Sequence, residues 1–358
     1  MRINIITQPL FCNYGGILQN YALQEVLRRM GHEVLTVNVP PREIASHPGW
    51  KDYAHSIINW GKRIRGQYDC PFLNPHTIAK KERELSDPQR EFVRKYINKV
   101  DCQSPFTHDT VLEHPADLWI VGSDQVWRPW CSPNIGNYFF DFLGYDTPRI
   151  AYAASFGTDR WEISEEQTLR VKELAARFKA ISVREASGVG LCKEYLGMEV
   201  QHVLDPTMLL SAEDYIALTG ENDYPQEHYI ATYILDPNPA KKIAIKDEAR
   251  TFGLPIVPVG RMHRDCFDSV GSWLATIAHS DRVITDSFHG TVFSIIFGTP
   301  VKILGNSLRG NARLESLTSM LSLNPDQDGY ISLEQQSLSK LEVLKIEALE
   351  FITKALRW

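Results

Sequence analysis

The sequence lacks both the cysteine spacing of a zinc site and an apolar run long enough to span a membrane. Its six cysteines lie far apart and form no C-x-x-C pair, so the sequence indicates neither a metal site nor a disulfide framework. No apolar run approaches the roughly 20 residues of a transmembrane helix. The apolar segment at the N-terminus is too short for a signal peptide. We therefore expect a cytoplasmic protein with reduced thiols and no metal.

A surplus of basic residues is also absent, because the formal net charge is −6 over 358 residues. Phosphate backbones attract basic faces, so we do not expect a nucleic-acid partner. One stretch that includes Tyr53, Trp60, Lys62 and Arg65 mixes aromatic and cationic side chains. This mixture is typical of a peripheral membrane contact, at the inner face of the membrane, or of a helix packed on its own domain.

The pattern that is present is a repeated alternation of strand and helix signals. A chain of 358 residues with 43% hydrophobic residues exceeds one ordinary core, so we expect two α/β domains. We predict an N-terminal domain over residues 1–207, which carries an insertion at about residues 40–115, and a C-terminal domain over residues 208–335. The segment 336–358 has leucines and isoleucines at helical spacing, which predicts a helix that packs back on a domain.

Residues 281–305 predict a strand, a helix and a second strand. In a parallel sheet, the carboxyl end of a strand and the first turn of the next helix lie at the edge where ligands bind. Ser287, His289 and Gly290 occupy that position. The unpaired N–H groups of the helix N-terminus favour an anion there. The alternative is that Ser287 only caps the helix and His289 lies on the surface.

Two glycines precede the first helix of the chain, in the segment Asn13-Tyr14-Gly15-Gly16. Without a Cβ atom they would let backbone N–H groups approach a ligand at the helix start, with Asn13 beside them. A tight turn without a ligand explains the same glycines equally well.

Polar residues also follow other strands of the first domain. Ser123 and Asp124 come after one strand, and Ser155 ends the next. Arg184 follows a third strand, where its guanidinium would clamp a carboxylate or phosphate through two hydrogen bonds, or pair with Glu185 or another local acid.

In the second domain, Arg309 and Arg313 follow the last strand and bracket a Gly-Asn turn. Two guanidinium groups there suit a multiply charged anion. Solvated surface arginines are the alternative.

A set of motifs in a fixed order resembles the polysaccharide pyruvyl transferase family. The motifs run from the first strand to about residue 323 and are NYGGILQNYALQEVL, VGSDQVW, YAASFG, ISVRE, LDPTMLL, ITDSFHGTVFSIIFGTPV and RGNARLESL. The resemblance implies two Rossmann-like domains facing a cleft, similar to GT-B glycosyltransferases. It also implies transfer of the pyruvyl group of phosphoenolpyruvate (PEP) to two hydroxyls of one sugar, which gives a cyclic ketal and phosphate.

The resemblance assigns roles to the candidate residues. His289 would protonate the enol methylene carbon, and Arg184 would clamp PEP. Arg309 and Arg313 would assist Arg184, and Asp124 would accept a proton from a sugar hydroxyl. Members of the family often carry an arginine two or four residues before the motif histidine, where this chain has Ser287 and Thr285. We therefore expect Arg309 or Arg313 to supply that charge.

The implied partners are PEP, as donor substrate and without a further cofactor, and a sugar acceptor that is nucleotide-linked or lipid-linked. Two alternatives remain open from the sequence. One is a GT-B glycosyltransferase that uses a nucleotide sugar, and the other is a non-catalytic sugar-binding protein of a polysaccharide cluster.

Overall fold

The computed structural model describes residues 1–40, 80, 83–220, 224–225, 227–260, 266–306 and 311–357. The aromatic and cationic stretch from Tyr53 to Arg65 lies outside these residues, and so does Arg309. Within the described residues, no helix is both long and apolar enough to cross a membrane.

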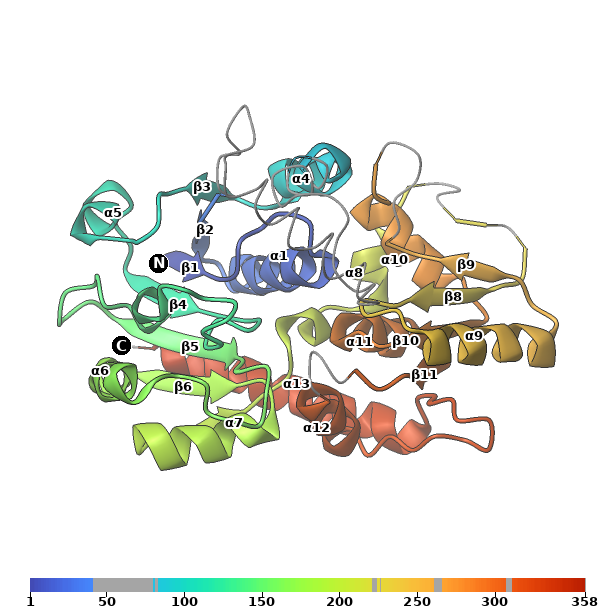
Figure 1. Ribbon diagram of the computed structural model, residues 1–358. Coiled ribbons are helices and arrows are strands. Elements are labelled where there is room, and N and C mark those ends of the chain that lie inside the picture. The colour runs from blue at the N-terminus through green and yellow to red at the C-terminus, as the bar shows by residue number, and fades with distance from the viewer. Residues whose placement is uncertain are drawn as a thin grey trace, which may run out of the picture.

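Two parallel sheets form the framework of the described chain (Figure 1). The first has the order β3-β2-β1-β4-β5-β6-β7 and the second the order β11-β10-β8-β9. Because strands are added outward on both sides of β1, the first sheet is doubly wound, as in Rossmann-like domains. The strands are β1 (Arg2–Ile6), β2 (Glu33–Asn38), β3 (Lys99–Asp101), β4 (Leu118–Val121), β5 (Arg149–Ala154), β6 (Ala180–Val183), β7 (Gln201–His202), β8 (Ile230–Tyr233), β9 (Ile256–Pro258), β10 (Arg282–Thr285) and β11 (Val301–Ile303).

Helices connect the parallel strands. They are α1 (Tyr14–Arg29), α4 (Asp87–Tyr96), α5 (His108–Glu113), α6 (Glu165–Ala175), α7 (Ala186–Leu191), α8 (Ala212–Ile216), α9 (Pro239–Phe252), α10 (Val270–Ala278), α11 (Phe288–Phe297), α12 (Ala312–Met320) and α13 (Gln335–Leu356), with the short turns η1 (Ile135–Phe139), η2 (Cys192–Leu196) and η3 (Pro206–Leu209). The predicted strand, helix and strand of residues 281–305 are confirmed as β10, α11 and β11.

The helix α11 has clear signals at both ends. Ser287 is its N-cap, and the Ser287 side chain accepts a hydrogen bond from the N–H of Gly290. Gly298 ends the helix in a left-handed conformation at φ 70°, which glycine adopts without steric cost. These signals fix the first turn of α11 directly after β10, at the carboxyl edge of the second sheet.

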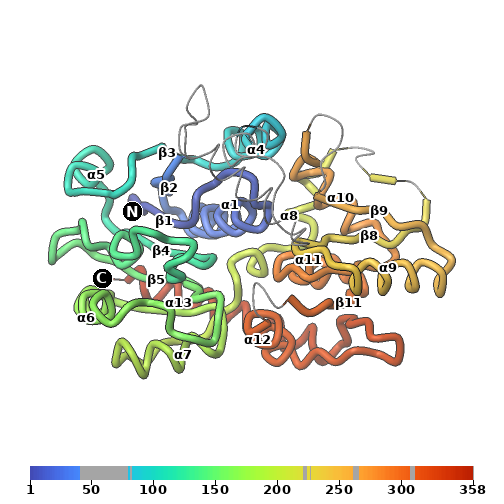
Figure 2. The backbone as a smooth tube through the Cα atoms, viewed as in Figure 1, coloured from blue at the N-terminus to red at the C-terminus, as the bar shows by residue number. Residues whose placement is uncertain are grey.

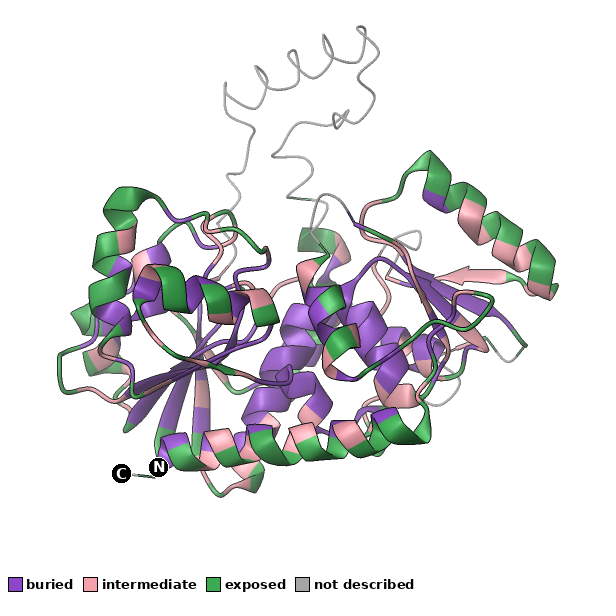
Figure 3. Ribbon diagram, turned by 90° about the horizontal axis from the view of Figure 1, so that it is seen from below, coloured by how far each residue is buried: buried purple, intermediate pink, exposed green. Residues whose placement is uncertain are grey.

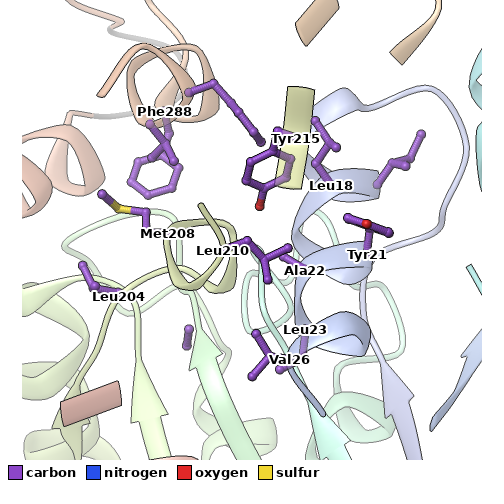
Figure 4. Close-up of a cluster of buried hydrophobic side chains, with 14 of the residues drawn as sticks. Leu18, Tyr21, Ala22, Leu23, Val26, Leu204, Met208, Leu210, Tyr215 and Phe288 are labelled. Carbon is purple, nitrogen blue, oxygen red and sulfur yellow. The ribbon is translucent and has the colours of Figure 1, made fainter. Parts of the chain in front are cut away.

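One continuous hydrophobic core joins the two sheets. Figure 4 shows Leu18 of α1, Met208 of η3, Tyr215 of α8 and Phe288 of α11 in the same cluster. These side chains are at most 6% exposed. Because packed interiors resist deformation, this shared core holds the edges of the two sheets in a fixed relation.

The chain passes to the second sheet between β7 and β8 and returns through α13, as the tube in Figure 2 shows. Residue 207, where we predict the domain boundary, lies between these two strands. Phe351 of α13 packs against Tyr152 of β5 with ring centroids 6.2 Å apart. Figure 3 shows both chain ends beside the first sheet, with a long helix whose outer face is exposed.

The strand β3 corrects part of our expectation for residues 40–115. Lys99–Asp101 pairs with β2 and is the edge strand of the first sheet, so the regular fold resumes before residue 115. The segment has a single apolar residue in three, which is too little for a recognisable strand signal.

Candidate functional site

A cavity of about 390 Å³ lies between the two sheets and is lined by residues of both domains. We call it the interdomain cavity. The first sheet's side contributes the loop Cys12–Tyr14 together with Asp124 and Gln125. The second sheet's side contributes the loop after β8 and the start of α11. Five of the residues predicted from the sequence line this cavity: Asn13, Asp124, Ser287, His289 and Arg313.

His289 stands in the first turn of α11, and its side chain is 8% exposed. Its imidazole lies against Gly15, at the start of α1 on the other side of the cavity. An ideal Cβ atom on Gly15 would be only 2.0 Å from Nδ1 of His289. The absence of a side chain at Gly15 therefore admits the imidazole, a role that we did not foresee for this glycine.

A buried carboxylate, Asp205, connects His289 to Arg184. Oδ2 of Asp205 lies 2.8 Å from Nη1 of Arg184 and 3.7 Å from Nε2 of His289. The second distance is too long for a hydrogen bond but within the range of an ion pair. Oδ1 of Asp205 accepts from the N–H and the hydroxyl of Thr207. Asp205 thus holds a guanidinium and an imidazole from the two sheets around one oxygen atom.

Arg184 lies behind the cavity and does not line it. Its side chain is 1% exposed, and it pairs with Asp124 as well as with Asp205. Its guanidinium carbon is 4.6 Å from the ring centroid of Phe288. Glu185, which we named as one alternative partner, does not pair with Arg184, because it accepts from Ser155 and from the N–H groups of residues 156 and 157. Direct contact with a ligand therefore requires movement of Arg184.

The charges in this group keep both aspartates ionised. Burial alone would raise the pKa of Asp205, but His289 and Arg184 outweigh burial and hold that pKa well below its usual range. Burial likewise raises the pKa of Asp124, and Arg184, His289 and Arg313 bring it below its ordinary value. Both carboxylates therefore carry their charge throughout the neutral pH range.

Arg313 is the guanidinium that faces the cavity. The residue is 8% exposed, and no described residue accepts a hydrogen bond from it. Burial, and then the nearby charge of Arg184, lowers the pKa of Arg313 to about 10. Its guanidinium carbon lies 5.9 Å from the ring of Phe288, the ring on which Arg184 also lies. Arg313 is thus a buried cation without a direct partner among the described residues.

The remaining predicted residues support the cavity without lining it. Ser123 is fully buried and donates to Gln19, and Ser155 is fully buried and donates to Glu185. A Cβ atom on Gly290 would meet Thr285 at 2.4 Å, and one on Gly16 would meet the side chain of Asn13 at 3.3 Å. We expected Ser123 and Ser155 to contact the substrate, but neither lines the cavity, and both support its wall instead.

Sequence reasoning missed Asp205 and Tyr14 as members of the site. Asp205 stands in the motif LDPTMLL, to which we assigned no role in the site. Tyr14 lines the cavity and stacks on Trp273 of α10, with centroids 5.3 Å apart. An aromatic residue within the Asn-Tyr-Gly-Gly segment was the available signal for Tyr14.

The comparison with family models agrees with this geometry. The model described as polysaccharide pyruvyl transferase matches residues 13–307, which include both sides of the cavity. This chain belongs to the polysaccharide pyruvyl transferase family. The resemblance inferred from the motifs is confirmed. A comparison with curated proteins gives no match.

Two solved structures are similar to this pyruvyl transferase family member, and at such low sequence identity the likeness concerns the fold alone. A putative UDP-N-acetylglucosamine 2-epimerase from Listeria monocytogenes has a TM-score of 0.50 at 11% identity, covering 99% of this chain and 88% of its own. A UDP-GlcNAc 2-epimerase from Methanocaldococcus jannaschii, in complex with UDP-GlcNAc and UDP, has a TM-score of 0.43 at 10% identity, covering 97% of this chain and 99% of its own. The predicted pair of Rossmann-like domains facing a cleft is thus confirmed.

Proposed function

We propose that the protein transfers the pyruvyl group of PEP to two hydroxyls of a sugar, forming a pyruvate ketal during cell-surface polysaccharide synthesis. The observation that carries this proposal is Arg313, a buried cation facing a cavity that also contains a helix N-terminus and an imidazole. A buried charge that has no hydrogen-bond or ion-pair partner among the described residues is costly, so an anionic ligand in this cavity is favoured.

PEP matches the charge of the cavity. It carries a phosphate and a carboxylate, and the cavity offers the guanidinium of Arg313 and the first turn of α11 at Ser287. Arg313 then supplies the positive charge that other members of the family often carry on an arginine two or four residues before the motif histidine, which is His289 here. The cavity volume of about 390 Å³ lies in the usual range for small-molecule sites.

The proposed chemistry assigns a proton transfer to His289. Protonation of the methylene carbon of PEP makes C2 electrophilic, and a first sugar hydroxyl bonds to C2. Loss of phosphate and attack by the second hydroxyl close the ketal. Each hydroxyl gives up one proton, so that one proton replaces the one that His289 donated and the other leaves with phosphate. Asp124 would accept one of these protons, late in the attack, because its low pKa makes it a weak base. Asp205 would orient the imidazole.

The first experiment incubates the protein with PEP and a panel of nucleotide-linked and lipid-linked sugars. The expected result is inorganic phosphate released from PEP, and an acceptor whose mass rises by one pyruvate less one water. Release of UDP from UDP-sugars without PEP would indicate glycosyl transfer instead. Sugar binding without either product would indicate a non-catalytic protein.

A second experiment tests the proton donor. His289→Gln should lower turnover by at least about 100-fold, the usual contribution of a general acid, while PEP still binds. His108→Gln is the matched control, because His108 is exposed on α5 and remote from the cavity lining. An unchanged rate in the His289 variant would remove this residue from the mechanism.

A further inference from the structure

A second and larger cavity lies at the edge of the first sheet. We call it the rim groove. It has a volume of about 890 Å³, and it lies where β1, β2 and β3 end, between the loops after these strands and the helix α4. The carboxyl edge of a parallel sheet is the usual position of ligands in this class of fold. None of the residues assigned above to PEP or to proton transfer lines it.

Cations dominate the lining of the rim groove. They are Arg83, Arg90, Arg94 and Lys99, and Asp101 is the one carboxylate among the described lining residues. Lys99 pairs with Asp101 at 2.5 Å, which neutralises that side of the groove. The remaining lining thus carries three guanidinium groups and no further described acid.

The arginines differ in their partners. Arg90 pairs with Asp87 and donates to the carbonyl of Arg83 at 2.9 Å, while its Nε atom is buried without a partner. For Arg83 and Arg94, no described residue accepts a hydrogen bond or forms an ion pair with the side chain. Guanidinium groups bind phosphate oxygens through paired hydrogen bonds, so two unpaired arginines in one groove suit a polyphosphate.

One loop connects the rim groove to the interdomain cavity. Residues 9–11 line the groove, and residues 12–14, which follow directly, line the cavity. Gln8 anchors this loop by donating to the carbonyl of Gln125 and to the hydroxyl of Ser132. Leu10 and Asn13 are separated by three Cα–Cα steps, so their Cα atoms are at most roughly 11 Å apart. The linings of the two cavities are therefore close together along this loop.

We propose that the rim groove binds the diphosphate of an activated sugar acceptor, whose diol then reaches His289 and Asp124 in the interdomain cavity. The inference rests on the proposed pyruvyl transfer for the identity of the ligand as acceptor. The diphosphate belongs either to a nucleotide-linked sugar or to a lipid-linked sugar, since both join a sugar to a diphosphate. The structure assigns the shared anionic group and its position.

The test uses a variant that removes both unpaired arginines, Arg83→Met with Arg94→Met. With acceptors that carry a diphosphate, KM for the acceptor should rise at least tenfold, while KM for PEP stays unchanged. With the same sugar lacking the diphosphate, the variant and the wild type should not differ. Lysine at both positions should restore only part of the affinity, since the charge remains but the paired hydrogen bonds are lost. Separate assays with nucleoside diphosphate sugars and polyprenyl diphosphate sugars identify the source of the diphosphate.

A matched control removes two exposed arginines elsewhere, Arg160→Met with Arg250→Met, and changes the net charge equally. An equal rise of KM in the control, or no rise in the groove variant, would overturn the proposal. A rise of equal size for the sugar without diphosphate would also overturn it, because the groove would then not recognise the phosphates.

A binding measurement separates this proposal from the proposed function. Calorimetric titration of the full chain with inorganic pyrophosphate should give binding that the groove variant weakens at least tenfold, whether or not PEP is turned over. Absence of phosphate release from PEP with intact pyrophosphate binding would refute pyruvyl transfer alone. Pyrophosphate binding that PEP displaces, and that Arg313→Met rather than the groove variant removes, would place the anion in the interdomain cavity and refute the groove.

Discussion

The imidazole of His289 occupies the space in which a side chain on Gly15 would begin. The two residues lie in the first turns of α11 and α1, two helices that belong to different sheets, and they are in direct contact. This contact couples the position of the candidate proton donor to the relation between the two sheets. It also explains why a glycine stands at the start of a buried helix, where alanine would otherwise favour helix formation.

We predict that Gly15→Ala displaces the imidazole of His289. The added Cβ atom would lie 2.0 Å from Nδ1, so either the ring or the start of α1 must shift. Because misplacement of a reacting group by about 1 Å costs roughly 100-fold in rate, turnover should fall at least tenfold. The measurement is the initial rate of phosphate release from PEP, with circular dichroism to establish folding.

Gly190→Ala is the matched control for this substitution. Gly190 lies exposed in α7 with no atom within 4 Å of an added Cβ. Alanine in a helix is favoured over glycine by roughly 0.5–1 kcal/mol, so the control should be as stable as the wild type or slightly more stable. Full activity of Gly15→Ala would mean that the ring is free to move without consequence.

We predict that Asp205→Asn destabilises the fold and makes the unfolding free energy depend less on pH in the acid range. The substitution leaves the buried guanidinium of Arg184 with one fewer carboxylate, which costs about 3–5 kcal/mol at neutral pH. The folded-state pKa of Asp205 is depressed, so its stabilising effect is present above its unfolded pKa of about 3.9 and is lost as pH falls below that value.

Denaturant unfolding between pH 7 and pH 3 measures this effect. The difference in unfolding free energy between wild type and Asp205→Asn should be largest at pH 7 and shrink below about pH 4. The exposed Asp146→Asn should differ from the wild type by less than about 0.5 kcal/mol. A difference that stays constant with pH would show that the carboxylate charge of Asp205 does not stabilise the fold.

Sequence patterns located the sheet edges well but not the direction of individual side chains. Periodicity and the Ser287 cap predicted β10, α11 and β11, because those signals are local. Ser123 and Asp124 are neighbours after one strand, yet Asp124 lines the cavity while Ser123 is held by Gln19. That difference depends on a tertiary contact with α1, which no local pattern contains.

Asp205 was missed for a related reason. Proline after it signals a chain break, and the signal is correct, since η3 begins there. Its function in the site appears only when Arg184 and His289, distant in sequence and from different sheets, meet its carboxylate. Arg184 was predicted as a site residue, but its ion pairs with Asp124 and Asp205 could not be predicted from the sequence spacing alone.

We predict strong coupling between Asp286 and Lys241. Their side chains meet at 2.6 Å, and both residues are buried. Asp286 also accepts from the N–H groups of Leu235 and Asp236, so it fixes the loop after β8. Asp286→Asn should cost about 3–5 kcal/mol of stability, because it leaves a buried ammonium group unpaired.

A double-mutant cycle tests this coupling. Adding Lys241→Met to Asp286→Asn should recover part of the lost stability, giving an interaction energy of about 1–3 kcal/mol. Urea unfolding of the wild type, the two single variants and the double variant supplies the four free energies. Strictly additive effects would show that the pair contributes nothing beyond its separate contacts.

We predict that removing the charge of Arg313 weakens PEP binding without lowering the stability of the fold. Burial lowers the pKa of this guanidinium to about 10, and no described residue accepts a hydrogen bond from it. Arg313→Met keeps the apolar stem and removes the charge. The unfolding free energy without ligand should then stay equal or rise by about 1 kcal/mol or more. PEP affinity should fall by roughly 10- to 100-fold, the worth of hydrogen bonds to a charged group.

A loss of PEP affinity without a loss of stability is the informative result, because substitution of a residue that only supports the fold would lower stability and affinity together. Denaturant unfolding without ligand and calorimetric titration with PEP measure the two quantities on the same protein. Arg313→Lys retains the charge but loses the paired hydrogen bonds, so its PEP affinity should lie between that of the wild type and that of Arg313→Met. Arg250→Met, on the exposed face of α9, should change neither quantity. Loss of stability in Arg313→Met with unaltered PEP affinity would place the anion elsewhere and remove the main support for the proposed function.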